Sequence, residues 1–258
     1  EVNMQEMLFN GMLFKTNFLS SLSFKEQLHM CFLDDNYWKL YLSGLGNTLL
    51  ITFFALIIGV VVGAILAIIR TTYDNTYKEM QRGVGKGLLK VLNLIAKIYL
   101  TVIRGTPVVV QIMIIYFIVF KSSNAQIAIA ALAFGINSGA YVAEIFRSGI
   151  MSIDAGQMEA GRSLGFNYIQ TMWFVIIPQA FKNVLPTLGN EFIVLLKETA
   201  VCGYIGLMDL TRAGDSVRAA TYQPFFPLLF IAAVYLIMVL FFTWLLGKLE
   251  RRLKNDER

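Results

Sequence analysis

The chain has 258 residues, of which 57% are hydrophobic and 15% are charged, and its formal net charge is +5. Soluble domains carry about 25% charged residues, so this composition excludes a soluble globular protein. Two cysteines are too few for a disulfide scaffold. The basic residues flank apolar segments instead of forming one basic face, which disfavours a nucleic-acid-binding protein.

The N-terminal part mixes Phe, Met and Leu with scattered charges. Residues 1–20 lack the basic flank and short apolar core of a signal peptide, and residues 9–22 are interpreted as an amphipathic or interfacial segment. The domain prediction is an extracytoplasmic or interfacial segment over 1–45, a transmembrane domain over 46–250 and a cytoplasmic tail over 251–258.

Long segments without charged residues predict membrane-spanning helices, because about 18 apolar residues suffice for a span. The predicted spans cover residues 46–69, 94–120, 127–146, 169–196 and 224–246. Gly59 and Gly63 in the first span allow another helix to approach closely. Pro178 and Pro186 argue against a straight, uninterrupted fourth span. The predicted fold class is an all-α, polytopic membrane protein with about five transmembrane helices.

The distribution of basic residues predicts the orientation. The segments predicted to face the cytoplasm are 70–90, 147–168 and 248–258. The segments predicted to face outward are 1–45, 121–126 and 197–218, the last of which is long enough to contain a re-entrant piece. The first group holds twelve Lys and Arg and the second holds seven. By the positive-inside rule, the N-terminus is expected outside and the C-terminus in the cytoplasm.

The second predicted inner segment contains a short helical pattern. It covers residues 157–164 and ends before Gly165, which has the position of a helix C′ glycine. Ala160 and Gly161 are small and leave the helix surface open. A cytoplasmic docking helix is the functional interpretation, and a simple surface connector is the alternative.

The same segment resembles the EAA loop of ABC importer permeases, whose pattern is E-A-A, three residues, G, nine residues and I-x-L-P. The pattern is carried here by Glu159-Ala160-Gly161, Gly165 and Val175-Ile176-Ile177-Pro178. Gly161 stands for the second Ala, Val175 for Ile and Ile177 for Leu. These exchanges are between small residues or between branched apolar residues, so they preserve the pattern.

Further segments over about residues 46–250 resemble the polar amino acid uptake subfamily and occur in its order. They are Arg104-Gly105-Thr106-Pro107-Val108-Val109-Val110-Gln111, Asn137-Ser138-Gly139-Ala140-Tyr141-Val142-Ala143-Glu144-Ile145-Phe146-Arg147, Pro178-Gln179-Ala180, Leu188-Gly189-Asn190-Glu191-Phe192 and Leu195-Leu196-Lys197-Glu198-Thr199. Glu198 stands where Asp is usual. Asp154 stands where Pro is usual, which predicts a less rigid turn before the docking helix.

The resemblance implies the permease subunit of an ATP-driven ABC importer for polar amino acids, a multi-pass protein of a bacterial inner or cytoplasmic membrane. Its 152–166 loop would dock as a coupling helix on ABC ATPase subunits. The implied coupling residues are Gly156, Glu159, Ala160, Gly161 and Gly165. The other implied partners are a second permease copy or paralogue, an extracytoplasmic solute-binding protein, the amino acid and membrane lipid, with no nucleic acid.

ATP, the expected energy source, is predicted to bind to a partner subunit. Residues 83–87, Gly-Val-Gly-Lys-Gly, are similar to a phosphate loop, but G-x-x-x-x-G-K-[ST] requires Gly in place of Met80 and Ser or Thr in place of Gly87. ATP and Mg²⁺ are therefore expected on the ATPase partner, and no cofactor, catalytic residue or metal site is predicted in this chain. The alternatives are an ion-gradient-driven secondary amino acid transporter or channel, and a non-transporting membrane scaffold.

Polar side chains inside the spans are costly in lipid and commonly mark a translocation path. The candidate path residues are Thr106, Gln111, Asn137, Ser138, Tyr141, Glu144, Asn190 and Glu191. Asn137, Tyr141 and Glu144 follow an i, i+4, i+7 spacing and so share one helix face. The sequence therefore predicts a polar line through the third span that can bind the ammonium and carboxylate groups of an amino acid.

Both candidate carboxylates have an alternative role. Glu144 can form a structural ion pair with Arg147 or Arg104 near the inner surface. Glu191 can bind a cationic group of the substrate or pair with Lys197. The sequence leaves both choices open.

The remaining reactive side chains carry little signal. Cys31 and Cys202 fall in predicted outer segments, where a disulfide is allowed, although thiols so far apart in sequence are expected to stay free. His29 is the single histidine and lies in the unmatched N-terminal part.

Overall fold

A computed structural model describes residues 23–121 and 123–255, and the predicted interfacial segment 9–22 lies outside these residues. The regular elements within the described ranges are all helical. They are α2 (Phe24–Phe32), η1 (Asp34–Asn36), α3 (Tyr37–Thr76), α4 (Val84–Gly105), α5 (Val108–Ile114), η2 (Ile115–Val119), α6 (Gln126–Met151), α7 (Ala155–Ser163), α8 (Tyr168–Thr171), η3 (Met172–Ile176), α9 (Ile177–Glu198), η4 (Thr199–Ile205), α10 (Leu210–Thr221) and α11 (Phe225–Asn255).

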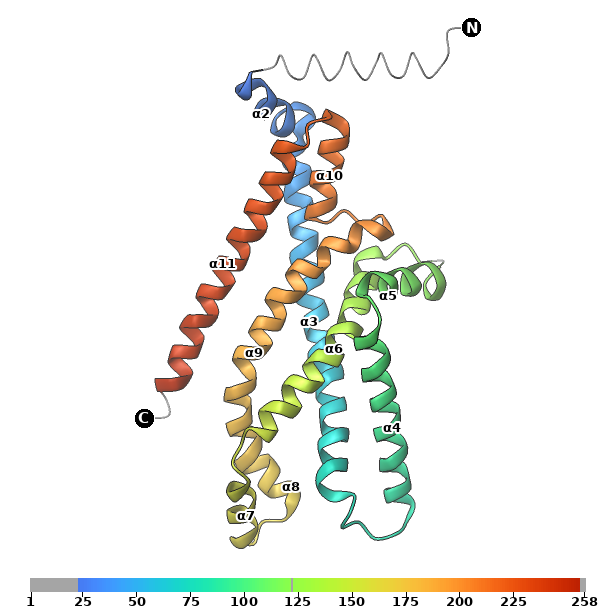
Figure 1. Cartoon of the computed structure of the whole chain (residues 1–258), viewed down its shortest axis with the longest axis vertical. Helices are drawn as coiled ribbons and strands as arrows, with labels where there is room; N and C mark the ends of the chain where they lie inside the picture. The colour runs from blue at the N-terminus through green and yellow to red at the C-terminus, as the bar shows by residue number, and fades with distance from the viewer. Residues whose placement is uncertain (1–22, 122, 256–258) are drawn as a thin grey trace.

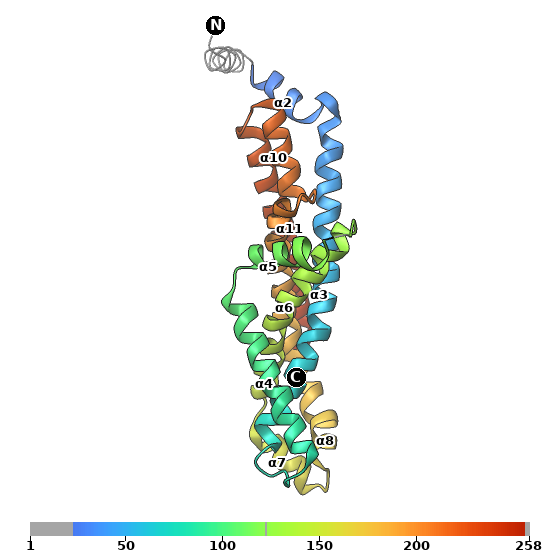
Figure 2. The same cartoon turned by 90° about the vertical axis from the view of Figure 1, so that its right-hand side faces the viewer.

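The helices form an elongated molecule with two distinct ends (Figure 1, Figure 2). α2 and α10 lie at one end, and α7, α8 and the α3–α4 connection lie at the other. α3 begins at Tyr37, before the predicted start at residue 46, and its 40 residues extend about 60 Å at 1.5 Å per residue. The hydrocarbon core of a bilayer is only about 30 Å thick, so α3 projects beyond it.

Membrane-spanning character is confirmed, although the number of spans is smaller by a strict criterion. In the described part of the chain, three helical segments are long and apolar enough to span, namely Asp34–Thr76, Gln126–Met151 and Phe225–Leu253. The bent pair Val84–Gly105 and Val108–Val119 makes a fourth if it counts as one span. α9 covers most of the remaining predicted span but carries Lys182, Asn190 and Glu191, which make it more polar. Five spans and their orientation therefore stay predictions.

The second predicted span is sharply bent in the structure, and whether it counts as one span stays open. α4 and the α5–η2 segment meet at an angle of 110°. Pro107 has no N–H and disfavours helical geometry at the preceding residue, and Thr106 is indeed extended, with φ −121° and ψ 146°. Gln111 satisfies backbone acceptors freed at the break, because its Nε2 donates to the carbonyl oxygens of Ile103 at 2.8 Å and Thr106 at 3.1 Å.

The fourth predicted span is helical without a gap from Tyr168 to Glu198, but it contains a π-helical turn and two prolines. The π-helical turn η3 directly precedes the first turn of α9, which contains Pro178, and Pro186 lies inside α9. A wider turn relieves the clash that a proline ring makes with the preceding turn of an α-helix. The helix therefore continues without an exposed break in the backbone.

α3 and α6 pack closely because small residues line their contact. A Cβ added to Gly63 would lie 2.6 Å from Val142 Cγ1, and one added to Gly59 would lie 2.9 Å from Ser138 Oγ. Lipid offers little hydrophobic drive for helix association, so tight van der Waals contact between such surfaces holds the pair. The glycine spacing noted in the sequence thus serves packing within this chain.

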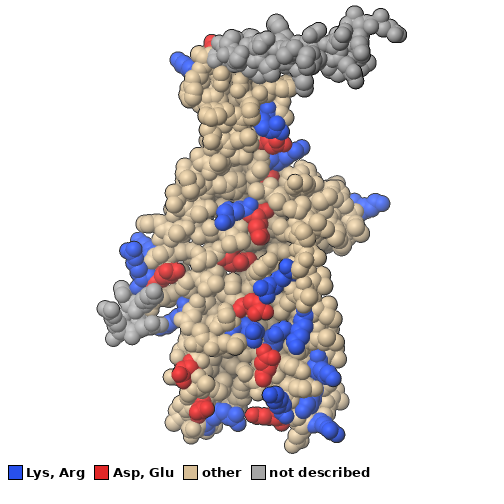
Figure 3. Space-filling model, viewed as in Figure 1, with Lys and Arg blue, Asp and Glu red and all other residues tan. Residues whose placement is uncertain are grey.

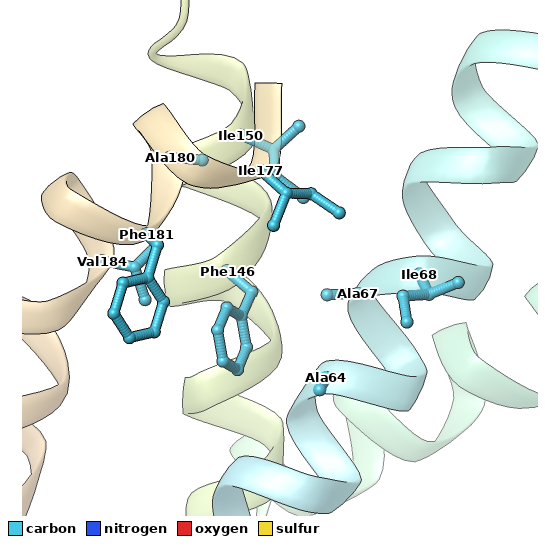
Figure 4. A pocket seen from close by; sticks show the side chains of 9 residues that line it. All are labelled: Ala64, Ala67, Ile68, Phe146, Ile150, Ile177, Ala180, Phe181 and Val184. Atoms are coloured by element: carbon cyan, nitrogen blue, oxygen red, sulfur yellow. The ribbon is translucent and has the colours of Figure 1, made fainter. Parts of the chain in front are cut away.

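An apolar cavity of about 160 Å³ lies between α3, α6 and α9. Phe146 and Phe181 face it from two helices, and Ala64 and Ala67 leave room on the α3 side (Figure 4). Its lining is apolar, so it offers no polar group that could bind a polar solute.

The two cysteines are free and buried, as expected. Cys31 packs with α10 and α11, where its Sγ lies 3.9 Å from Thr221 Oγ1. Cys202 belongs to a separate cluster with Ile51 and Ile112. The two cysteines therefore pack in different clusters of the core.

Candidate functional site

The predicted docking helix is present as α7, and its first turn is fixed by a side chain. Asp154 is the N-cap, and its Oδ1 accepts a hydrogen bond from the Gly156 N–H at 2.7 Å. Aspartate is a favoured N-cap because it satisfies an amide that has no partner inside the helix. Asp154 therefore provides a side-chain cap at the position where the family pattern has proline, and the expectation of a less rigid turn stays a prediction.

The end of α7 has the predicted glycine geometry. Leu164 is the C-cap, and Gly165 has φ +92°, a conformation that residues with a Cβ rarely adopt. The Phe166 N–H donates to the Gly161 carbonyl oxygen at 3.2 Å, and the Gly165 N–H donates to that of Arg162 at 3.0 Å. These two bonds form a Schellman motif, which explains why glycine follows the helix.

The five predicted coupling residues do not all face outward. Gly156, Glu159, Ala160 and Gly165 are exposed, whereas Gly161 is buried. A Cβ added to Gly161 would lie 2.5 Å from Thr171 Cγ2. Gly161 therefore packs α7 against the following helix, and the other four predicted positions are exposed on α7, at the end of the molecule (Figure 1).

Replacing Gly161 with alanine, the residue of the family pattern, should lower the free energy of unfolding. In Gly161→Ala the new methyl group overlaps Thr171, so we expect a loss of about 1–3 kcal/mol in stability, as for other overpacked sites. Thr171→Ser should rescue the variant because it removes Cγ2 and keeps the hydroxyl that donates to the Asn167 carbonyl oxygen at 3.0 Å. Thermal unfolding of the purified protein measures both effects.

Gly46→Ala is the matched control for this prediction, because a Cβ there has no atom within 4 Å to meet. A melting temperature for Gly161→Ala equal to that of the control would show that α7 does not pack as described.

The candidate path begins with an amide network at the α4–α5 break. Asn137 is 3% exposed, and its Nδ2 donates to Gln111 Oε1 at 2.9 Å. Gln111 Nε2 in turn donates to Thr106 Oγ1 at 2.7 Å. The structure thus joins three of the predicted residues from α5, α6 and the break. Their mutual bonds fix the position of the break against α6.

A hydrogen-bonded pair, Ser138 and Glu191, lies next to this network. Ser138 is fully buried, and its Oγ donates to Glu191 Oε1 at 2.7 Å. Within the described residues Glu191 forms no ion pair, and Lys197 is exposed, so the pairing with Lys197 considered from the sequence is not formed. Glu198 follows two helical turns later on the same face of α9. Asn190 is exposed and does not join this pair.

Glu144 forms the ion pairs with Arg104 and Arg147 that the sequence offered as the alternative to a role in the translocation path. Its carboxylate lies 3.8 Å from Arg104 Nη1 and 3.4 Å from Arg147 Nε. Arg147 Nη1 also lies 3.4 Å from Asp74 Oδ2 on α3. The guanidinium of Arg104 lies over the ring of Tyr141 at 5.7 Å. These residues connect α3, α4 and α6 in the half of the molecule that contains α7.

The sequence did not identify Asp74 as part of this ion-pair network. The apolar run of the first span ends at Ile69, which placed Asp74 in a loop, whereas α3 continues to Thr76. Its spacing of four residues from Arg70 is a helical signal that could have found it. The Asn75 side chain also donates to the Tyr168 hydroxyl at 3.1 Å and so connects α3 to α8.

The geometry therefore divides the predicted residues into three groups. The first is the exposed surface of α7, the second is the amide network with the Ser138–Glu191 pair, and the third is the ion-pair network around Glu144. The half-buried carboxylate of Glu191, which has no cationic partner among the described residues, can bind a cationic group, because an unpaired charge away from water is costly. The amides supply neutral donors and acceptors beside it.

Comparison with known proteins identifies similar membrane components of transport systems. Residues 83–255 match the family model described as a binding-protein-dependent transport system inner membrane component. The arginine transport system permease protein ArtQ of Bacillus subtilis is 43% identical over 166 residues, which are 63% of this chain and 76% of that protein. The glutamine transport system permease protein GlnP of Escherichia coli K12 is 39% identical over 168 residues, which are 64% and 77% of the two chains.

Two solved structures of ABC transporters have a similar fold. A crystal structure of an amino acid ABC transporter with histidines is similar with a TM-score of 0.73 and 44% identity, over 84% of this chain and 95% of that one. An inward-facing structure of the MetNI methionine ABC transporter has a TM-score of 0.68 over 86% of this chain and 99% of that one. Its identity is 21%, so it shows the shared fold alone.

Proposed function

Because the chain belongs to the family of binding-protein-dependent transport system inner membrane components, we propose that it is the permease subunit of an ATP-driven importer of polar amino acids. The observation that carries the proposal is the exposed α7, which presents an EAA-type loop between two capped ends. Two similar proteins are named as arginine and glutamine permeases, which supports the substrate class.

The proposed partners follow from this role. ABC ATPase subunits dock on the exposed residues of α7 and bind ATP and Mg²⁺. A second permease copy or a paralogue completes the path, and a solute-binding protein delivers the amino acid on the side opposite α7. The proposed location is the inner or cytoplasmic membrane of a bacterium, and the proposed transmembrane domain covers residues 46–250. The N-terminal segment 1–45 lies on the extracytoplasmic side in this proposal, and residues 251–258 form the cytoplasmic tail.

The proposed translocation path passes the Ser138–Glu191 pair. The Glu191 carboxylate accepts a hydrogen bond from Ser138 and retains acceptor capacity for the ammonium group of an amino acid. Thr106, Gln111 and Asn137 hold the helix break beside it, so they set the width and polarity of the path. Tyr141, Glu144 and Asn190 complete the proposed set, with Glu144 acting through its ion pairs.

Uptake by reconstituted vesicles tests the proposed function. The chain is purified from its native host, and co-purification of a subunit with a Walker motif is expected. Proteoliposomes with that subunit and the binding protein should take up amino acid only when ATP is present, and an ionophore should not change the rate. Uptake that persists without the ATPase subunit and collapses with the ionophore would establish the secondary transporter in its place.

A further inference from the structure

The charged residues of α4 are all basic and lie on one side of the helix. They are Lys86, Lys90, Lys97 and Arg104. Their spacings of four, seven and seven residues are those of positions that share one helix face. At about 1.5 Å per residue they form a basic stripe about 27 Å long, close to the thickness of the hydrocarbon core. Figure 3 shows basic side chains in the lower right part of the molecule, where Figure 1 places α4.

The stripe lies between two other surfaces of α4. One surface is buried against neighbouring helices and contains Asn93, Ala96 and Leu100. The surface opposite to it is exposed and apolar, and it is formed by Val91, Leu94, Ile95, Ile98 and Val102. An exposed apolar surface suits lipid, whereas a row of charges does not. The basic stripe therefore borders an environment other than lipid.

Lys97 lies near the middle of the membrane. The Tyr99 hydroxyl donates to the carbonyl oxygen of Ile136 on α6. The neighbouring Gly135 packs on Ile58, since a Cβ added to it would lie 2.6 Å from Ile58 Cβ, and Ile58 is at the centre of the predicted span 46–69. Lys97 is two residues from Tyr99, or about 3 Å along the helix axis. The middle of the hydrocarbon core is about 15 Å from either headgroup layer, which is more than a lysine side chain spans.

Lys97 has no counter-ion in the described part of the chain. Its side chain is exposed and forms no ion pair or hydrogen bond there. Arg104 is paired only loosely, because its Nη1 lies 3.8 Å from Glu144 Oε1 and its side chain is 47% exposed. Cations within a membrane are costly, and they almost always face a bundle interior or a water-filled cavity and pair with an opposite charge. The basic stripe therefore indicates an anionic group that another molecule brings.

The basic stripe adjoins the proposed translocation path. Arg104 lies two residues before Thr106 at the helix break, and its guanidinium lies over the Tyr141 ring at 5.7 Å. From there α4 runs toward the end of the molecule that contains α7 (Figure 1). An anion that moves from the break toward that end passes first Arg104, then Lys97 and then Lys90.

We propose that Lys97 and Arg104 bind the α-carboxylate of the transported amino acid on the α7 side of the helix break. This inference rests on the proposed function and adds the anion-binding half of the same path. Glu191 offers acceptors to the ammonium group, whereas Lys97 and Arg104 offer charged donors to the carboxylate. The two charges of a zwitterion are then matched by opposite charges on α9 and α4. A lipid phosphate and a carboxylate of a second permease copy are the other occupants, and the tests below distinguish them.

Thiol labelling shows whether Lys97 faces water. Lys97→Cys and Ile98→Cys are made in the full chain, whose own cysteines are buried, and each variant is placed in nanodiscs with its ATPase partner. The reagent is 2-sulfonatoethyl methanethiosulfonate, and mass spectrometry of the permease measures its rate. Ile98 has the same depth but lies on the apolar surface, 55% exposed. We expect labelling of Lys97→Cys to be at least about tenfold faster, because thiolates form in water and not in lipid. Equally slow labelling of both variants would overturn the proposal.

Protection from labelling tests the carboxylate. Millimolar arginine or glutamine should slow the labelling of Lys97→Cys several-fold, because Arg104 still holds the carboxylate in this variant. The α-amides of the same amino acids lack the carboxylate and should give no protection. A rate that neither amino acid changes would leave the cations to lipid phosphate or to the second permease copy. That result, or equal protection by the amides, would contradict the proposal.

ATP-driven uptake separates this inference from the proposed function. Lys97→Gln should lower the initial rate about tenfold, as the loss of a hydrogen bond between charged groups predicts. Lys97→Arg keeps the charge and should retain more activity than Lys97→Gln. Arg251→Gln removes an exposed charge from α11 and should not change uptake. An unchanged rate in Lys97→Gln would overturn the inference and leave the proposed function intact. A wild type without ATP-dependent uptake would contradict the proposed function, whereas the labelling results are read without ATP.

Discussion

Replacing Glu159 with alanine should reduce amino acid uptake by more than about tenfold while the permease is still made and inserted. Glu159 is exposed on α7, and its side chain supports no described contact within the chain. Under the proposed function, its loss acts on the ATPase subunit that docks there. A hydrogen bond to a charged group contributes about 1.5–3 kcal/mol, which corresponds to at least a tenfold change in equilibrium. Uptake and ATP hydrolysis are measured together in proteoliposomes.

Gln157→Ala is the control for this prediction, because Gln157 is also exposed on α7 but points to a different side of the helix. We expect the control to transport normally, and Glu159→Ala to hydrolyse ATP without matching uptake. Normal ATP-driven uptake by Glu159→Ala would remove α7 from the coupling role.

Glu191→Gln should lower uptake by about tenfold to a hundredfold, because it removes a charge that can bind an ammonium group and is worth about 1.5–3 kcal/mol. The fold should be retained, since the amide oxygen of glutamine can still accept the hydrogen bond from Ser138. The measurement is the initial rate of uptake with saturating binding protein, using arginine and glutamine as separate substrates.

Glu250→Gln removes the same charge from α11, away from the proposed path, and should not change uptake. Ser138→Ala should give a smaller loss than Glu191→Gln, because it removes a neutral donor and leaves the carboxylate in place. An unchanged rate for Glu191→Gln with both substrates would exclude Glu191 from the path.

Local sequence signals predicted those parts of the molecule that depend on neighbouring residues. The short helix α7 ends before Gly165 as its sequence pattern predicts, and Gly165 has the positive φ that favours glycine at this position. The irregular helical geometry of the fourth span, with a π-helical turn directly before Pro178, agrees with the signal of its prolines. The resemblance of the EAA-type loop then led to the family that the comparisons establish.

Contacts between distant segments were not predictable in the same way. The 110° bend at Pro107 was not predicted, and there Gln111 donates to the carbonyl oxygens of Ile103 and Thr106. Gly161 looked like an open docking residue, whereas Thr171 on the next helix makes it a packing residue. The roles of Glu144 and Asp74 likewise depend on the ion pairs that their carboxylates form with Arg104 and Arg147.

The sequence by itself determined the membrane class, the helical fold, the short helix α7 and the family, because apolar runs, prolines, glycines and motif spacing act locally along the chain. Only the tertiary structure decided which polar side chains meet. It paired Ser138 with Glu191 and placed Glu144 between two arginines. The physical reason is that an ion pair or hydrogen bond requires atoms within a few ångströms of each other, and helix packing sets that distance.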